Sequence, residues 1–509
     1  MIIAGGHAVG SFARLRMTEG LSPISTSATC RRYGNRRPPP YSFLVNRSIH
    51  REKLARVGLR VLRAFVVKLS DLRRELRPTL ALAFPIIVGQ VSQMLIGLTD
   101  NAFIGRVGKE ALAAAAFTHG VFGIFYVVGI GLLVGAGVFA ARDHGAGDEA
   151  GCAAWLRHGR ALALAVGLGF FGFMMLASTQ LHRFGQPPEV VAIVRPFFLL
   201  IAASVVPALV FQVQRQFAES LGRPWVPMGI ILADVALNAL LNWMLVFGHL
   251  GFPALRLVGS GWATLIARLV AVVAIAIWLR RSRHFAVVRA APWRGWERTR
   301  FVSLLRLGGP AGGMLFFEAG AFAAAALMMG WLGTVPLAAH QVALGCAALS
   351  FMVPLGLSIA VSLRISRAQG EGRIAALRPI GFGALATGVV FMAGCALVFA
   401  FAGRWIAAGF TPAADVAGLA TQLLLVAAFF QLFDGGQVIS VGALRGLHDV
   451  RVPTLITFVA YWVVSLPLGY LLAFHTLLGA VGLWTGLAAG LACAAVLLGW
   501  RFHRLTLLR

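Results

Sequence analysis

The chain has 509 residues, of which 59% are hydrophobic and only 12% are charged. Soluble domains average about 45–50% apolar and about 25% charged residues, so this composition excludes an ordinary soluble fold and indicates an integral membrane protein. A net charge of +27 would suit a protein that binds nucleic acid. The basic residues, however, lie in an N-terminal stretch and between apolar runs, as in membrane proteins, so we expect a lipid bilayer and no nucleic acid as partner.

Residues 1–74 form a basic extension that differs from the rest of the chain. It contains the pairs Arg31–Arg32 and Arg36–Arg37 and three consecutive prolines at 38–40. No apolar run with a small-residue cleavage site follows Met1, so the pattern of a secretory signal peptide is missing. We expect a disordered or cytoplasmic segment without a chemical role. An organelle transit peptide and an over-long gene model are the alternatives.

From about residue 79 onward the chain consists of apolar runs that are long enough to cross a bilayer, which takes about 20 residues. The runs predict twelve membrane helices near 79–104, 111–140, 158–181, 189–221, 224–248, 259–280, 301–331, 335–366, 376–403, 413–446, 450–475 and 479–501. Pro85 and Pro310 lie inside runs, but bundled membrane helices tolerate proline because neighbouring groups satisfy the freed backbone. The predicted fold is therefore an all-α integral membrane protein.

Basic residues are distributed unequally between alternate loops. With the N-terminus inside, the loops on the opposite side carry only Arg106, Lys109, Arg183, Arg256 and Arg404, with Arg195 near a helix entrance. The inside loops carry all the other loop arginines, and the densest group lies at 281–300. By the positive-inside rule, both termini should be cytoplasmic and the number of spans even.

The chain also repeats itself. Pro85, Gly105, Gly108, Leu112, Arg142, Gly145 and Gly147 recur 225 positions later as Pro310, Gly330, Gly333, Leu337, Arg367, Gly370 and Gly372. We therefore predict two six-helix lobes, 75–282 and 301–509, which form a parallel repeat and are joined by a basic cytoplasmic linker, 283–300. Secondary transporters often contain such repeats, with a substrate site between the halves near the bilayer midplane.

Few ionisable side chains lie inside the predicted helices, and each is a functional candidate because burial in a membrane is costly. The acids are Glu318, Asp434, Asp100 and Asp234. The amides Asn238 and Asn242 share a helix face with Asp234, and Gln212 and Gln216 share a face of the preceding helix. The alternative for each is a structural role, in which a protonated acid or an amide hydrogen-bonds between helices.

Burial disfavours the charged form of a carboxylate, so either a proton or Na⁺ can neutralise it. A cationic substrate can compete for the same charge, and this competition is what an antiporter needs.

The five cysteines, Cys30, Cys152, Cys346, Cys395 and Cys493, show no spacing typical of disulfides or metal ligands.

Several motifs resemble the multidrug and toxic compound extrusion (MATE) family, NorM-type branch. In the second half they are Phe317-Glu318, Ala339-His340-Gln341, 430–437, Ala443-Leu444-Arg445-Gly446 with Asp449, Ala460-Tyr461-Trp462 and Leu466-Pro467. In the first half, Pro85, Asp100, Gly105, Asn238, Asn242 and Trp243 are similar to the family pattern. The resemblance covers roughly 75–505. It implies an antiporter without a cofactor that exports organic cations or drugs in exchange for H⁺ or Na⁺, located in a bacterial inner membrane.

The resemblance also implies roles for particular residues. Glu318 and Asp434 match the family's cation-site acids and would hold Na⁺ if the protein is sodium-coupled, whereas Asp100, Asn238 and Asn242 match a polar cluster proposed to carry protons. We group Asp234, Gln212 and Gln216 with that cluster as a substrate site or proton relay, and assign Gln341 and Gln437 to the polar lining of the second lobe. Phe430 stands where some sodium-coupled members have Tyr, and Asp234 is not part of the pattern. The coupling ion therefore stays open.

Two other functions are weighed against export. A flippase of a lipid-linked intermediate would need a cationic cavity for phosphates, but the few charges deep in the predicted spans are mostly acidic. A membrane-embedded enzyme would need a nucleophile or metal motif such as H-E-x-x-H or G-x-S-x-G within a span, and the spans contain none. We therefore expect a transporter rather than an enzyme, and a monomer.

Overall fold

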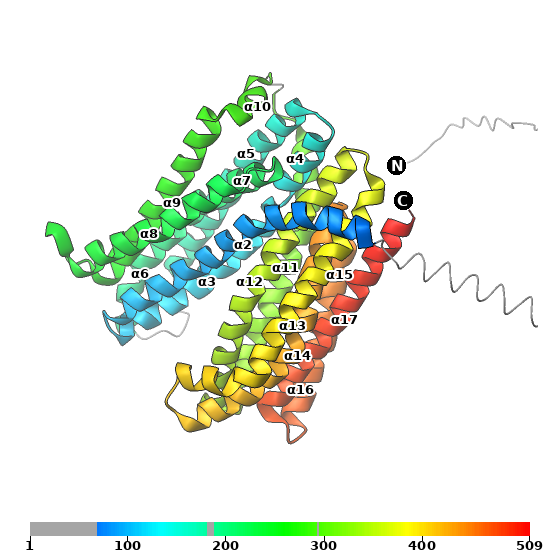
Figure 1. The fold of residues 1–509 in the computed structure, drawn as a ribbon. Coiled ribbons are helices and arrows are strands. Elements are labelled where there is room, and N and C mark those ends of the chain that lie inside the picture. The colour runs from blue at the N-terminus through cyan, green and yellow to red at the C-terminus, as the bar shows by residue number, and fades with distance from the viewer. Residues whose placement is uncertain (1–68, 181–187, 293–294, 509) are drawn as a thin grey trace, which may run out of the picture. The chain divides into compact units, whose positions relative to one another are not determined.

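A computed structural model describes residues 69–180, 188–292 and 295–508 (Figure 1). Most of the expected N-terminal extension, with Cys30, lies outside these residues, as do Arg183 and Arg294. The described helices are α2 (Leu69–Gly105), α3 (Lys109–Leu133), α4 (Gly135–Gly145), α5 (Glu149–Ser178), α6 (Pro188–Ala203), α7 (Val205–Ser220), α8 (Trp225–Phe247), α9 (Arg256–Arg281), α10 (Ala286–Ala290), α11 (Arg298–Leu332), α12 (Thr334–Gly370), α13 (Leu377–Phe410), α14 (Ala414–Gly446), α15 (Arg451–Phe458), the π-helical segment η5 (Val459–Ser465), α16 (Leu466–Phe474) and α17 (Gly479–Leu507). Short 3₁₀ turns lie at His249–Gly251, Arg283–Phe285 and Ile374–Ala376.

Twelve helical segments within the described residues are long and apolar enough to cross a membrane, which confirms the predicted number. Three of these spans combine neighbouring helices: α3 with α4, α6 with α7, and α15 with η5 and α16. No β-strand occurs in the described part of the chain. The all-α membrane fold expected from composition is therefore confirmed.

Several spans are longer than their apolar runs. α5 begins at Glu149 rather than near residue 158, because the Asp148 carboxylate caps the helix by accepting a hydrogen bond from the Gly151 N–H at 2.8 Å. α13 continues past Arg404 to Phe410. Charged residues in the first or last turns reach water at the membrane surface, so an apolar window places the ends of these helices too far inward.

The buried apolar residues form separate cores that follow the two halves of the chain. One core consists mainly of residues between Ile104 and Val288. The other two consist of residues from the second half, with only Ala83 and Ile86 added from the first. The first turns of α2 therefore pack on the second lobe, while the rest of α2 continues into the first.

The lobes touch most closely at one end, where the α4–α5 and α12–α13 turns lie; we call it the basic end, after Arg142 and Arg367. A Cβ atom on Gly145 would overlap the carbonyl oxygen of Arg367, and a Cβ atom on Gly370 would overlap that of Arg142. The contact is reciprocal: Gly145 meets Arg367, and Gly370, the repeat equivalent of Gly145, meets Arg142, the repeat equivalent of Arg367. The Ser366 hydroxyl donates a hydrogen bond to the Val138 carbonyl at 2.7 Å and fixes the same approach.

A second close approach joins α3 to α11. A Cβ atom on Gly131 would overlap the backbone of Gly312, and one on Gly308 would overlap the Leu132 carbonyl oxygen. Small residues let membrane helices approach until their backbones touch. We call Gly131, Gly145, Gly308, Gly312 and Gly370 the glycine seam, and this seam holds the lobes together at and near the basic end.

Candidate functional site

Two acids predicted from the sequence come together in the second lobe. Glu318 lies on α11 and Asp434 on α14, where Asp434 is only 5% exposed. The Tyr461 hydroxyl lies 3.5 Å from Glu318 Oε1 and donates a hydrogen bond to it. When both acids are ionised their charges repel each other. A cation or proton that binds between them removes this repulsion, so the pair is suited to holding one positive charge.

The local helix geometry positions Tyr461. This residue lies in η5, where the eleventh span widens from an α-helix to a π-helix. Gly490 of α17 faces this segment, because a Cβ atom there would lie 2.6 Å from the Ala460 carbonyl oxygen. Single π-helical turns inside helices occur often at functional sites. Sequence reasoning used Tyr461 only as part of a motif and did not predict its contact with Glu318.

Aromatic side chains lie close to Tyr461 and the acid pair. The Phe430 ring lies 6.3 Å from that of Phe322 and 5.6 Å from that of Trp484. Of the two predicted lining amides, Gln437 is buried, and its Oε1 has no hydrogen-bond partner among the described residues. The side chain of Gln341 is exposed on α12. The two carboxylates of the second lobe thus lie among largely apolar, aromatic side chains.

The predicted polar cluster of the first lobe gathers around Asp100, which is 2% exposed. The Asn242 amide donates to Asp100 Oδ1 at 2.8 Å and lies 3.2 Å from Asn238 Oδ1. The Thr264 hydroxyl donates to Asp100 Oδ2 at 3.2 Å. Donors from two neighbouring helices, α8 and α9, therefore satisfy this buried carboxylate of α2, as an enclosed acid requires.

Asp234 faces the same region but is less satisfied. A cavity of about 270 Å³ is lined by Asp100, Asp234, Arg268 and aromatic residues that include Phe122 and Tyr126. Asp234 Oδ1 is buried without a hydrogen-bond partner in the described part of the chain. This oxygen is available to a ligand, because a buried acceptor gains most from being paired.

Arg268 is a site residue whose position the sequence did not settle. Its Nη1 donates to the Ser204 hydroxyl at 2.6 Å, and its guanidinium carbon lies 4.6 Å from the centre of the Phe122 ring. The side chain therefore stays inside the lobe and does not extend toward a membrane surface. Its charge acts on both Asp100 and Asp234. The two acids and this arginine leave the cavity with one net negative charge when all three are ionised.

The other two predicted members of this cluster, Gln212 and Gln216, lie beside it rather than in the same cavity. Both residues line a different cavity of about 160 Å³, which is bordered from the second lobe by Ser362 and Arg445. The cause is packing: α7 turns this face toward α4, where a Cβ atom on Gly137 would lie 3.1 Å from the Gln216 Cβ. Gln93 lines both cavities and connects them. It stands 225 positions before Glu318, at the equivalent place in the first repeat.

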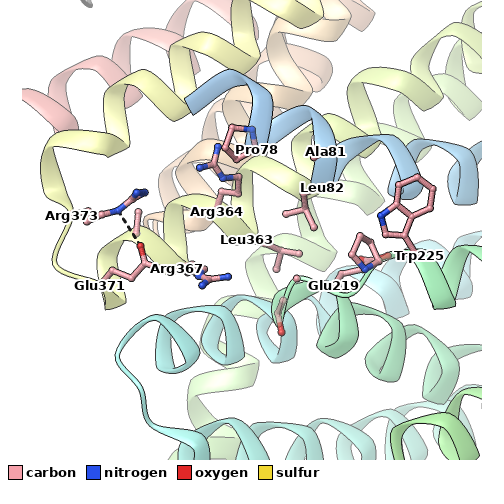
Figure 2. Close-up of a pocket in the computed structure, with 14 residues that line it drawn as sticks. Pro78, Ala81, Leu82, Glu219, Trp225, Leu363, Arg364, Arg367, Glu371 and Arg373 are labelled. Atoms are coloured by element: carbon pink, nitrogen blue, oxygen red, sulfur yellow. Dashed lines mark hydrogen bonds and ion pairs between the residues drawn. The ribbon is translucent and has the colours of Figure 1, made fainter. Parts of the chain in front are cut away.

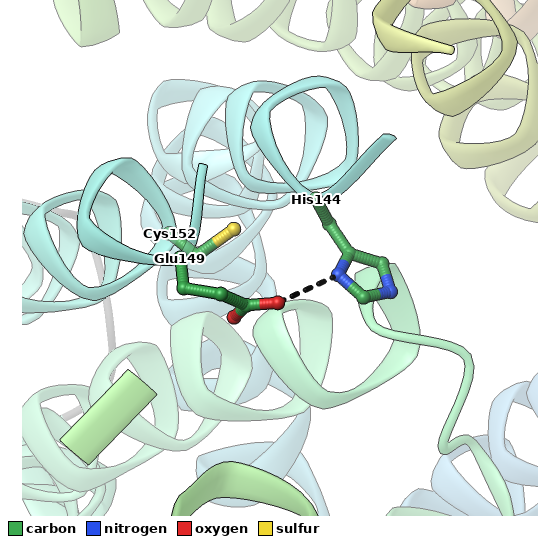
Figure 3. Close-up of side chains that lie close together, drawn as sticks. All are labelled: His144, Glu149 and Cys152. Atoms are coloured by element: carbon green, nitrogen blue, oxygen red, sulfur yellow. Dashed lines mark ion pairs between the residues drawn. The ribbon is translucent and has the colours of Figure 1, made fainter. Parts of the chain in front are cut away.

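One group of potential metal ligands was not expected from the sequence. His144, Glu149 and Cys152 offer ligand atoms that lie within 4.8 Å of one another on the α4–α5 turn (Figure 3). Packing accounts for the buried thiol, which lies 3.5 Å from the Ala140 carbonyl oxygen. His144 Nδ1 and Glu149 Oε1 are 3.7 Å apart, which is too long for a hydrogen bond. The group lies apart from both acid clusters along the chain.

Solved structures share this fold. One is described as "Outward-facing conformation of a multidrug resistance MATE family transporter of the MOP superfamily"; it superimposes with a TM-score of 0.77 at 22% identity and covers 85% of this chain and 95% of that chain. Another, "Crystal structure of Vibrio cholerae MATE transporter VcmN D35N mutant", gives a TM-score of 0.78 at 20% identity and covers 86% and 98%. At these identities the likeness establishes the fold alone.

Other proteins share a larger fraction of identical residues with this chain. A protein of Mesorhizobium japonicum named "Probable multidrug resistance protein NorM" is 37% identical over 445 residues, which are 85% of this chain and 94% of the relative. A protein of Pseudomonas putida with the same name is 38% identical over 445 residues, with 85% and 96% covered. The family model MatE matches twice, at 85–244 and 310–471, which confirms the internal repeat. The sequence resemblance is thereby confirmed, and the chain belongs to the MatE family.

Proposed function

We propose that this protein is a multidrug efflux antiporter, which exports small organic cations in exchange for H⁺ or Na⁺. The names of its relatives support a role in multidrug resistance. The single observation that carries the coupling is the pair Glu318, which is partly buried, and Asp434, which is buried, in an apolar lobe. Such a pair is costly to keep in a membrane unless its charge is used. We place the protein in a bacterial inner membrane, with both termini and the basic end in the cytoplasm.

The exchange follows from competition for negative charge. A proton or Na⁺ neutralises the pair Glu318 and Asp434 in one arrangement of the lobes. An organic cation binds in the other arrangement, with its positive group at the free oxygen of Asp234 and its rings against Phe122. Because each ligand binds one arrangement better, each shifts the population of the lobes in its own direction. The glycine seam is the contact that closes the basic end in one of these arrangements.

The deciding experiment measures ethidium efflux from the purified protein in liposomes. A proton gradient and a sodium gradient are imposed separately, with a matched liposome preparation that lacks protein as control. Efflux driven by one gradient supports the proposal and identifies the coupling ion. No ethidium movement under either gradient, from protein shown to be folded, would overturn export of this substrate class and favour a lipid-linked flippase on the same fold.

The variant Glu318→Gln should remove the dependence of transport on the ion gradient. Glutamine keeps the size and can still accept the Tyr461 hydrogen bond, but it neither binds a proton nor neutralises Na⁺. We expect the gradient-stimulated part of ethidium efflux to fall at least about tenfold, since the loss of one charge contact costs upward of about 1.4 kcal/mol. Glu110→Gln, at an exposed position on α3, is the matched control. An unchanged gradient dependence in Glu318→Gln would remove this residue from the coupling.

A further inference from the structure

The basic end carries two cavities at equivalent places of the two repeats. The first, of about 530 Å³, is lined from α2 by Pro78, Ala81 and Leu82 (Figure 2). The second, of about 300 Å³, is lined from α11 by Ser303, Arg306 and Leu307, each 225 positions later. We call them the first-repeat pocket and the second-repeat pocket. Each also contains the turn that follows the fourth span of its own lobe, at Gly222 and at His448 respectively.

Each arginine of the first-repeat pocket pairs with a carboxylate of the chain itself. Arg364 pairs with Glu75 at 2.5 Å, and Glu371 pairs with Arg367 at 2.8 Å and with Arg373 at 3.0 Å. Figure 2 shows the pair Arg373 and Glu371 beside the cavity. These arginines therefore already have partners within the chain.

The second-repeat pocket lacks these internal counterions. Arg306 and Arg451 are exposed, and the side chain of neither has an ion pair or hydrogen bond to any group in the described part of the chain. The one carboxylate of the pocket, Asp449, is held by Arg501 at 2.5 and 3.1 Å. Arg300 occupies the position equivalent to Glu75 in the second repeat, and Ala146 occupies the position equivalent to Glu371 in the first repeat. The pocket therefore offers two guanidinium groups to an external anion.

The position of the pocket along the helices indicates where that anion comes from. Arg306 lies in the third turn of the span Arg298–Leu332, and Arg451 is the first residue of the span Arg451–Phe474. Beside them Leu305 is 44% exposed and Leu455 is 60% exposed. Side chains at helix ends reach the headgroup region, while exposed leucines alongside suit acyl chains. Basic pockets between membrane helices bind the headgroups of anionic lipids.

We propose that the second-repeat pocket binds the phosphate headgroup of an anionic phospholipid between Arg306 and Arg451. Guanidinium groups suit this ligand because they donate paired hydrogen bonds to phosphate oxygens. The pocket also spans the two lobes: the ring of Phe139, from the first lobe, stacks on His448 at 5.2 Å and 14°. A bound lipid therefore stabilises the arrangement in which the basic end is closed. This site does not depend on the proposed transport activity.

The test is a titration of the full-length protein, in neutral detergent, with short-chain phosphatidylglycerol below its micelle concentration, followed by native mass spectrometry. We expect saturable binding to the wild type, and binding about thirtyfold weaker in Arg306→Gln/Arg451→Gln, from roughly fivefold per arginine. Arg281→Gln, an exposed arginine at the same end, is the control and should bind like the wild type. Circular dichroism shows whether each variant is folded, and the single variants Arg306→Gln and Arg451→Gln serve if the double variant is not.

Two comparison ligands identify the source of the phosphate. Short-chain phosphatidylcholine, which carries no net charge, should bind at least about fivefold more weakly than phosphatidylglycerol. Inorganic phosphate should not displace the lipid at equal concentration, because it lacks the acyl chains that contact Leu305 and Leu455. Equal binding of phosphatidylglycerol by the wild type and the folded arginine variants would overturn the site. Full displacement by inorganic phosphate would show that the pocket binds a free anion and would overturn the lipid as its ligand.

Discussion

Asp434→Asn should abolish ethidium export while leaving the amount of folded protein in the membrane unchanged. Asparagine has the shape of aspartate but cannot take up a proton or neutralise Na⁺, so the acid pair loses one of its two charges. Removing one partner from a buried charge interaction costs about 3 kcal/mol, which corresponds to more than a hundredfold in rate or affinity. The fold should tolerate the change, because a neutral group is cheaper to bury in apolar surroundings than a charged one.

The measurement is ethidium efflux from liposomes that contain equal amounts of protein. Asp415→Asn is the matched control: it makes the same substitution on the same helix, at an exposed residue whose carboxylate accepts a hydrogen bond from the Val416 N–H at 2.9 Å. Asparagine can accept that bond equally well, so this variant should transport like the wild type. Wild-type efflux by Asp434→Asn would exclude the acid pair as the coupling site.

Gly308→Ala should shift the protein away from the arrangement in which the basic end is closed. The added methyl group would overlap the carbonyl oxygen of Leu132, which is backbone and cannot rotate aside. Such overpacking costs typically about 1–3 kcal/mol, and a difference of that size changes a two-state ratio about 5- to 150-fold. Transport should fall because the cycle requires both arrangements. Spin labels on Arg281→Cys and Arg504→Cys, one in each lobe, should report a longer distance between the lobes in Gly308→Ala than in the protein that keeps Gly308.

The adjacent glycine provides the control. Nothing lies within 4 Å of a Cβ atom on Gly309, so Gly309→Ala adds the same methyl group to the same helix without a clash. Any general effect of alanine on helix stability, about 1 kcal/mol, is shared by both variants. If the two variants gave the same distances and transport rates, the seam would not control the closure of the lobes.

The spans and the acids could be predicted from the sequence, but their groupings could not. Twelve apolar runs are recognisable because a bilayer sets the length of each helix, and Glu318 and Asp434 stand out because charge is rare in such runs. Membrane helices are apolar on all sides, however, so their sequences do not reveal which face meets which neighbour. The sequence therefore groups Gln212 with Asp100, although Gln212 lines a different cavity, which is bordered by Ser362 and Arg445. The π-helical turn that brings Tyr461 to Glu318 has no signal in the hydropathy pattern either.

The reciprocal contact between Gly145 and Gly370 constrains both copies of the repeat in the same way, whereas other parts of the two halves can change independently. Each glycine faces the backbone close to the other glycine, so neither copy can acquire a side chain there without disturbing both. The candidate binding sites of the two halves are not constrained by each other in this way. Gln93 and Glu318 occupy equivalent positions, and so do the two pockets at the basic end, yet their chemistry has diverged. As we propose them, ion binding belongs to one half and lipid binding to one pocket, while the contact between the halves stays symmetrical.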